Sequence, residues 1–193
     1  MDLTQGSFNE KDARAKKMML WFGIISLLMM FAGLTSAYVV SKNRPDWLQD
    51  FELPGAFLWS TITILLSSVT IHLAKKAIKK GKNRDGMLLL LSTLVLGILF
   101  IVFQFKGYGQ IIENGYYFTG SQSTVTTSFL YAITIAHIAH VVAGIIVLVV
   151  IIYNHFKEKY NEGKTLGLEL GATFWHFLDF LWVYLILFFY FFR

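Results

Sequence analysis

The chain has 193 residues, 55% of them hydrophobic, a formal net charge of +5 and no cysteine. Its mean hydropathy is +0.56, and apolar runs along the whole length favour a polytopic membrane protein over a soluble domain. The lack of cysteine excludes disulfides, thiolate metal sites and cysteine nucleophiles. The positive charge does not indicate nucleic-acid binding, because the Lys and Arg residues lie between the apolar segments, where membrane topology accounts for them.

Five apolar segments follow one another, at residues 18–40, 56–74, 87–105, 126–153 and 170–192. Each approaches or exceeds the roughly 20 residues that cross a bilayer as a helix, and none alternates like a barrel strand. We therefore predict an all-α fold, with one membrane domain over residues 1–193 formed by a bundle of five transmembrane helices. The first segment is interpreted as a retained span, because no convincing cleavage site follows it.

The Lys and Arg residues predict the orientation of this bundle. Thirteen of the 17 lie before the first span, between the second and third, or between the fourth and fifth, and the other four lie on the opposite side. Because cytoplasmic loops are enriched in Lys and Arg, the N-terminus is predicted to be cytoplasmic and the C-terminus outside.

The first span carries a line of small side chains at helical spacing. The line consists of Gly23, Ser26, Met30, Gly33 and Ala37. Such stripes let two membrane helices approach closely, so we predict that this face packs within the bundle.

The last span carries three ionisable residues on one face. At about 100° per residue, Glu169 and His176 nearly eclipse each other, and Asp179 lies about 60° from His176. An ionisable group at the centre of an inserted helix costs roughly 2.5–3.5 kcal/mol. This face is therefore predicted to look into protein, headgroup or water rather than into acyl chains.

The fourth span adds two histidines. If the last two spans are antiparallel neighbours, His140 and Asp179 lie at a similar depth. The residues predicted to form a buried hydrogen-bonded cluster are His137, His140, His176 and Asp179, with Glu169 at its edge. Such a cluster can pin a subunit interface, order a lipid headgroup or relay protons. His72, at the end of the second span, is a weaker candidate for the same roles.

Two other functions compete with this interpretation. One is a free-standing b-type cytochrome with His137, His140 and His176 as candidate ligands. Against it, the sequence has no second His pair at an equivalent depth and no Glu-x-x-His pattern. The other is a small transporter that uses the polar cluster as its binding site, which the absence of a visible inverted repeat disfavours.

Four sequence motifs indicate a family resemblance. Residues 174–185 read Phe-Trp-His-Phe-Leu-Asp-Phe-Leu-Trp-Val-Tyr-Leu, and Glu169 precedes their His by seven residues. This pattern resembles the Tyr-Trp-His-Phe-Val-Asp-Val-Val-Trp stretch that closes subunit III of the haem–copper cytochrome oxidases, where a Glu stands at the same distance from the His. Residues 137–144 resemble the family's His-Gly-Leu-His-Val segment. Further matches lie at residues 31–38 and 66–72, in the same order as in the family.

The resemblance implies a non-catalytic subunit that binds no haem or metal itself. The expected partners are subunit I, which would hold the haem a and the oxygen-reducing copper, subunit II, and bound phospholipid. The subunit would stabilise subunit I and support proton uptake during the reduction of oxygen. The expected location is a bacterial inner (cytoplasmic) membrane. A quinol oxidase subunit III is the alternative, because the electron donor is read on subunit II.

The sequence departs from the family pattern in two ways. It has five spans where the longer members have seven, and in those members the first two form one wall of a lipid-holding cleft. The resemblance therefore implies that this cleft is either open here or walled by another subunit, and the candidates for that wall are a further subunit or a respiratory supercomplex. In addition, Leu27 stands where many members carry an intramembrane glutamate, so no role of that carboxylate carries over.

Overall fold

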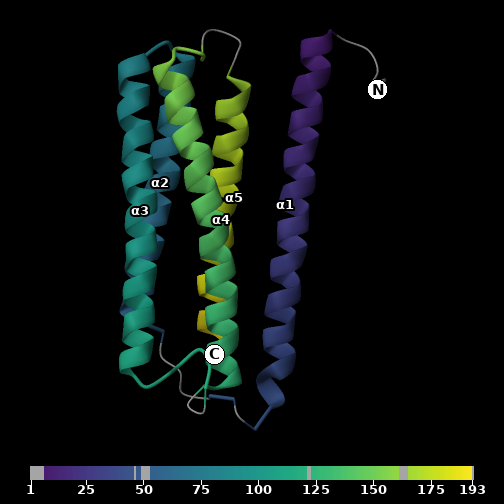
Figure 1. Cartoon of the computed structure of the whole chain (residues 1–193), viewed down its shortest axis with the longest axis vertical. Helices are drawn as coiled ribbons and strands as arrows, with labels where there is room; N and C mark the ends of the chain where they lie inside the picture. Colours follow the sequence, from purple (N-terminus) through teal and green to yellow (C-terminus); the bar gives the residue numbers. More distant parts are fainter. Residues whose placement is uncertain (1–6, 46, 49–52, 121–122, 161–164, 193) are drawn as a thin grey trace.

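The computed structural model describes residues 7–45, 47–48, 53–120, 123–160 and 165–192. These residues form a bundle of long antiparallel helices, and the only pairing of β type among them is an isolated bridge between Tyr117 and Ser123 (Figure 1). The helices are α1 (Phe8–Val40), α2 (Gly55–Lys79), α3 (Asn83–Glu113), α4 (Val125–Phe156) and α5 (Leu166–Phe192), with a short 3-10 turn at Ser41–Asn43. All five are long and apolar enough to cross a membrane, which confirms the predicted all-α fold.

Each helix contains one of the apolar segments and extends beyond it, with local signals at its ends. The Ser7 side chain accepts a hydrogen bond from the Glu10 backbone N–H, and the Glu10 carboxylate accepts one from the Ser7 backbone N–H, which caps α1. Helix α2 begins directly after Pro54, whose fixed φ suits a helix start. Gly81 has φ +74°, a left-handed conformation that residues with a side chain rarely adopt. Glycine at this position therefore allows the tight turn from α2 to α3.

Helix α5 is the central helix and α1 is the peripheral one. Half of the most apolar stretch of α5 is buried inside the bundle, against 17% for α1. Around α5 the core has two parts. The part nearer the C-terminal end of α5 is centred on Trp182, Phe57 and Phe100, and the other part on Trp175 and Leu148. The position of α5 explains why its sequence is so rich in aromatic side chains.

The first helix packs through bulky side chains rather than through its small ones. Ile24, Phe31, Thr35 and Tyr38 are buried, whereas all five residues of the small stripe are exposed. A Cβ added at Gly33 would meet nothing within 4 Å. The prediction that the small stripe packs within the bundle was therefore wrong, because the larger apolar residues bury more surface against α4 and α5.

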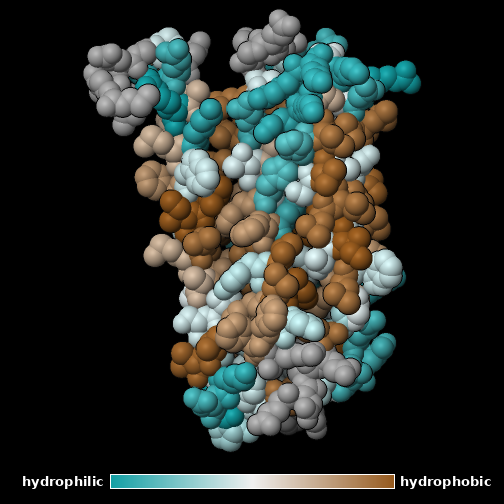
Figure 2. Space-filling model, turned by 180° about the vertical axis from the view of Figure 1, so that it is seen from behind, coloured by the Kyte–Doolittle hydropathy of each residue, from teal (hydrophilic) through white to brown (hydrophobic). Residues whose placement is uncertain are grey.

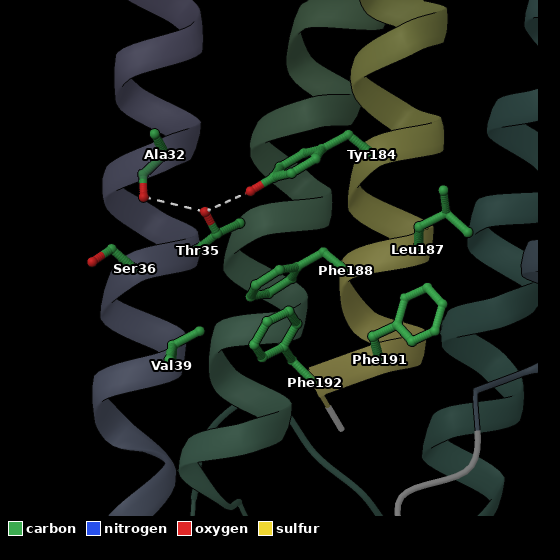
Figure 3. Close-up of a pocket in the computed structure, with 9 residues that line it drawn as sticks. All are labelled: Ala32, Thr35, Ser36, Val39, Tyr184, Leu187, Phe188, Phe191 and Phe192. Atoms are coloured by element: carbon green, nitrogen blue, oxygen red, sulfur yellow. Dashed lines mark hydrogen bonds between the residues drawn. The ribbon is translucent and has the colours of Figure 1, made fainter.

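A side-chain hydrogen bond ties α1 to α5 within the membrane zone. The hydroxyls of Thr35 and Tyr184 lie 3.2 Å apart, and a groove of about 480 Å³ opens beside them between the two helices (Figure 3). Phe188 and Phe192 form its aromatic wall. A second groove of about 250 Å³ lies further along the same two helices. Helix α1 thus leaves apolar space along α5 instead of filling it.

Gly107 allows α3 to approach α2 closely. A Cβ at this position would lie 2.7 Å from Cδ1 of the buried Phe57 ring. We expect Gly107→Val to lower the free energy of unfolding by about 1–3 kcal/mol, because the ring cannot move away in a packed core. Unfolding in mixed micelles, followed by circular dichroism, measures the change. The control is Gly109→Val on the same helix, where an added Cβ meets nothing within 4 Å. Equal losses for the two variants would contradict this explanation.

Candidate functional site

The three ionisable residues of α5 do share one face, and that face lies against α2. Glu169 forms an ion pair with Lys79 at the last turn of α2. About two turns further along α5, Nδ1 of His176 lies 2.7 Å from the hydroxyl of Ser68. The polar face predicted from the sequence is therefore covered in part by the hydroxyl-rich helix α2.

Asp179 is the deepest polar residue of this face. It is 3% exposed, and neither carboxylate oxygen makes a hydrogen bond with the described residues. Ser68 lies close enough to interact with the Asp179 carboxyl, and the same hydroxyl lies 2.7 Å from Nδ1 of His176. A buried polar group without a partner costs about 1–3 kcal/mol. Asp179 therefore lowers the stability of the chain when the chain is on its own.

His72 extends the polar face from the side of α2. Its ring centroid is 6.2 Å from that of His176, its side chain is exposed, and it has no hydrogen bond among the described residues. We name the group that runs along α2 and α5 the polar strip; it consists of Lys79, Glu169, His72, His176, Ser68 and Asp179. Figure 2 shows a hydrophilic band that descends from the upper end of the molecule over the side where α2 and α5 face the viewer.

The two histidines of α4 do not join the polar strip. His137 is fully buried, and its Nε2 lies 3.2 Å from the backbone oxygen of Leu178. Nδ1 of His140 lies 2.6 Å from the Ala136 oxygen of its own helix. Both rings pack edge-on against Phe31. The prediction of a single cluster was wrong. Helix α5 meets α2 and α4 with different faces, and its ionisable side chains lie on the face that meets α2.

The arrangement of the histidines does not fit a haem or a metal ion. The His137 ring is enclosed by Phe31, Phe100 and Trp182, whereas His176 turns toward α2. Within the described ranges, no three His, Cys, Asp or Glu side chains are grouped so that they could hold a metal ion. No chemical step through a bound haem or metal is therefore assigned to this chain.

Sequence reasoning missed the role of the tryptophans of α5. Nε1 of Trp175 donates to the Ser67 hydroxyl at 3.0 Å, and Nε1 of Trp182 donates to the Thr61 hydroxyl at 2.9 Å. The hydroxyls of α2 thus accept hydrogen bonds from two positions of α5 that are about two turns apart. The clue in the sequence was the coincidence of a hydroxyl-rich span with a Trp-rich one, since a buried indole N–H needs an acceptor.

His155 is a second residue that the sequence did not single out. It is buried at the end of α4, where Nε2 donates to the backbone oxygen of Asn83 at 3.0 Å and the ring stacks on Tyr160. Burial raises the pKa of the Tyr160 phenol, and a hydrogen bond with Asn154 opposes that rise. The hydrogen bond from His155 to Asn83 ties the end of α4 to the start of α3.

Comparison with known proteins shows what this bundle belongs to. A family model described as "Cytochrome c oxidase subunit III" matches residues 4–193, nearly the whole chain. The chain belongs to the cytochrome c oxidase subunit III family. Membership places it in a respiratory chain, as a multi-pass membrane subunit of a terminal oxidase complex.

Individual members of the subunit III family align over most of the chain. "Cytochrome c oxidase subunit 3" of Corynebacterium diphtheriae is 30% identical over 171 residues, which cover 85% of this chain and 82% of that relative. The protein of the same name from Pyricularia grisea is 30% identical, with 95% and 71% covered. That of Bos taurus is 29% identical, with 84% and 64% covered. The family resemblance inferred from the motifs is confirmed.

The subunit III motifs occupy defined places in the fold. The motif at residues 174–185 forms the middle of α5 and supplies His176 and Asp179, and residues 66–72 of α2 supply Ser68 and His72 opposite them. Leu27, at the position of the family glutamate, is partly buried on α1. Two motifs distant in sequence therefore form one structural unit, the polar strip.

Proposed function

We propose that this chain is the non-catalytic subunit III of a proton-pumping, aa3-type haem–copper oxidase that passes electrons from cytochrome c to O2. In this role it stabilises subunit I, retains phospholipid and supports proton uptake. The observation that carries the proposal is the polar strip, because it places an exposed imidazole, a half-buried imidazole and a buried carboxyl without a hydrogen bond among the described residues along one pair of membrane helices. Such groups mark functional contacts in membrane proteins.

The candidate residues divide between two roles in this proposal. Glu169, His176, Asp179 and His72 lie along the polar strip and are proposed as interface residues toward another subunit or lipid. His137 is enclosed in the bundle, so its proposed role is to hold α4 to α5. His140 is half-buried beside it and is proposed to support the same packing.

The proposal of bound phospholipid also has a structural basis. The grooves between α1 and α5 are lined mainly by apolar and aromatic side chains, including Tyr184, which borders both of them. Acyl chains fit such walls because they add dispersion contacts and need no polar partner.

We propose that haem a and copper reside in subunits I and II, and that the membrane is a bacterial inner membrane.

The direct test is spectroscopic. The chain is tagged at its N-terminus and purified from native membranes in mild detergent, and a reduced-minus-oxidised spectrum is recorded. The proposal expects an a-type haem signal that stays with the larger subunits when this chain is removed. A haem signal that stays with the isolated chain would overturn it and favour the b-type cytochrome. Oxygen uptake with reduced cytochrome c or with quinol as donor separates the two kinds of oxidase.

The proposed orientation has its own test. The basic residues around the α2–α3 turn are Lys75, Lys76, Lys79, Lys80, Lys82 and Arg84. We expect their replacement by Glu to disturb the outside location of a C-terminal tag, because these charges dominate the positive-inside bias. Protease accessibility of the tag in sealed vesicles measures the effect. Lys42→Glu with Arg44→Glu, at the opposite end, is the control and should leave the tag in place. An unmoved tag in the six-residue variant would refute this origin of the topology.

A further inference from the structure

The polar strip continues into an apolar groove along the same pair of helices. The groove has a volume of about 410 Å³ and lies between the start of α2 and the end of α5. Leu58 and Thr61 line it from α2, and Val183 and Tyr190 from α5. Residues 58, 61, 65, 68 and 72 follow one another at helical spacing on α2, as do 190, 187, 183, 179 and 176 on α5. We call the groove and the polar strip together the α2/α5 seam.

The α2/α5 seam is as tall as the hydrocarbon core of a bilayer. Tyr190 follows Glu169 by 21 positions along α5, a rise of about 32 Å, against a core of about 30 Å. A phospholipid of one leaflet covers about half of that height. Its headgroup would also have to sink about 15 Å below the level of Glu169 to reach Asp179. A helix that crosses the membrane, by contrast, can cover the whole height of the seam and also reach Asp179.

The chemistry of the seam describes that helix further. About a third of the way along the seam from Glu169, it must offer a hydrogen-bonding side chain to the exposed His72 and the half-buried His176, since imidazoles facing acyl chains are costly. Near the end of α5 it must offer bulky apolar side chains to the groove. His72 and Leu58 are 14 residues apart on α2, as are His176 and Tyr190 on α5, so the two features should be about four turns apart on the partner.

We infer that the α2/α5 seam docks one membrane-spanning helix of another subunit, with a polar side chain at the level of His72 and His176 and bulky apolar side chains about 14 residues away. The inference rests on the proposed function, because the partner belongs to the oxidase complex. It goes further by assigning the surface, the kind of partner and the register of the contact.

Cysteine cross-linking tests the inference in the intact complex, because the natural chain has no cysteine. Leu58→Cys and Leu65→Cys place a benzophenone label on exposed positions of the seam. After illumination of native membranes, mass spectrometry should find one partner helix at both labels, with the cross-linked sites about seven residues apart. Val142→Cys and Val149→Cys on exposed positions of α4 have the same spacing and should not capture that helix.

Each outcome of this experiment decides the matter. Lipid adducts alone at the two seam labels, a second copy of this chain, or several proteins without a common helix would overturn the inference. Adding His72→Leu and His176→Leu should lower capture at both seam labels about threefold, since interhelical polar contacts contribute modestly in membranes. Unchanged capture of the partner helix would overturn the inferred polar contact at the level of His72 and His176. An a-type haem spectrum of the same sample tests the proposed function separately.

Discussion

Trp182→Ala is expected to lower the free energy of unfolding of the isolated chain by about 3–5 kcal/mol, the usual cost of removing a large aromatic side chain from a core. The Trp182 ring is 0% exposed, with its centroid 5.9 Å from that of Phe57 and 5.2 Å from those of Phe100 and His137. The substitution also removes the hydrogen bond to Thr61. Four helices meet at this one side chain, so its loss affects the whole bundle.

Detergent-induced unfolding, followed by circular dichroism in mixed micelles, measures the effect of Trp182→Ala. The matched control is Trp59→Ala, because Trp59 is 62% exposed and lies outside the core. We expect the control to change the free energy of unfolding by less than about 0.5 kcal/mol. A loss as large in the control as in Trp182→Ala would show that the fold does not depend on this packing.

Asp179→Leu is expected to have opposite effects on the chain and on its complex. In the isolated chain the substitution removes a buried carboxyl without a partner, so the free energy of unfolding should rise by about 1–3 kcal/mol. In native membranes the same variant should insert normally but be retained less well by the other subunits, or lose activity sooner during turnover. The reason is that the polar strip then offers one polar group fewer to its partner.

Two measurements on each variant separate these effects. Unfolding in mixed micelles reports on the chain, and the fraction that co-purifies with a-type haem reports on assembly. Asp12→Leu is the control, because Asp12 is an exposed residue paired with Lys16 near the start of α1 and should change neither quantity. Asp179→Leu with reduced chain stability would contradict the first expectation. Unchanged assembly and turnover would show that the carboxyl is dispensable.

The last span illustrates how far the sequence could predict the candidate site. The spacing of Glu169, His176 and Asp179 placed them on one face without knowledge of any contact, because helical periodicity is a local property. The sequence did not show which helix that face meets. In the structure this face meets α2, where Lys79 and Ser68 contact it. Spacing within one helix carries no information on its rotation relative to its neighbours.

The first and fourth helices show where sequence patterns misled. The small stripe with Gly33 matched a packing motif, but Phe31 and Tyr38 bury more surface and turn the stripe outward. His137 and His140 were predicted to form one cluster with His176, but Nε2 of His137 contacts the backbone oxygen of Leu178 instead. Backbone acceptors are available on every turn of a helix, so the choice of partner depends on side-chain packing.

The sequence by itself determined the number of spans, their helical form, the polar face of the last one and the family. These follow from apolar length, periodicity and motif order, all of which are properties of short stretches of chain. Only the tertiary structure decided that α5 is central, that α2 covers its polar face and that His137 is enclosed. Those features depend on how five helices rotate to bury the most surface together, and that competition has no local signature.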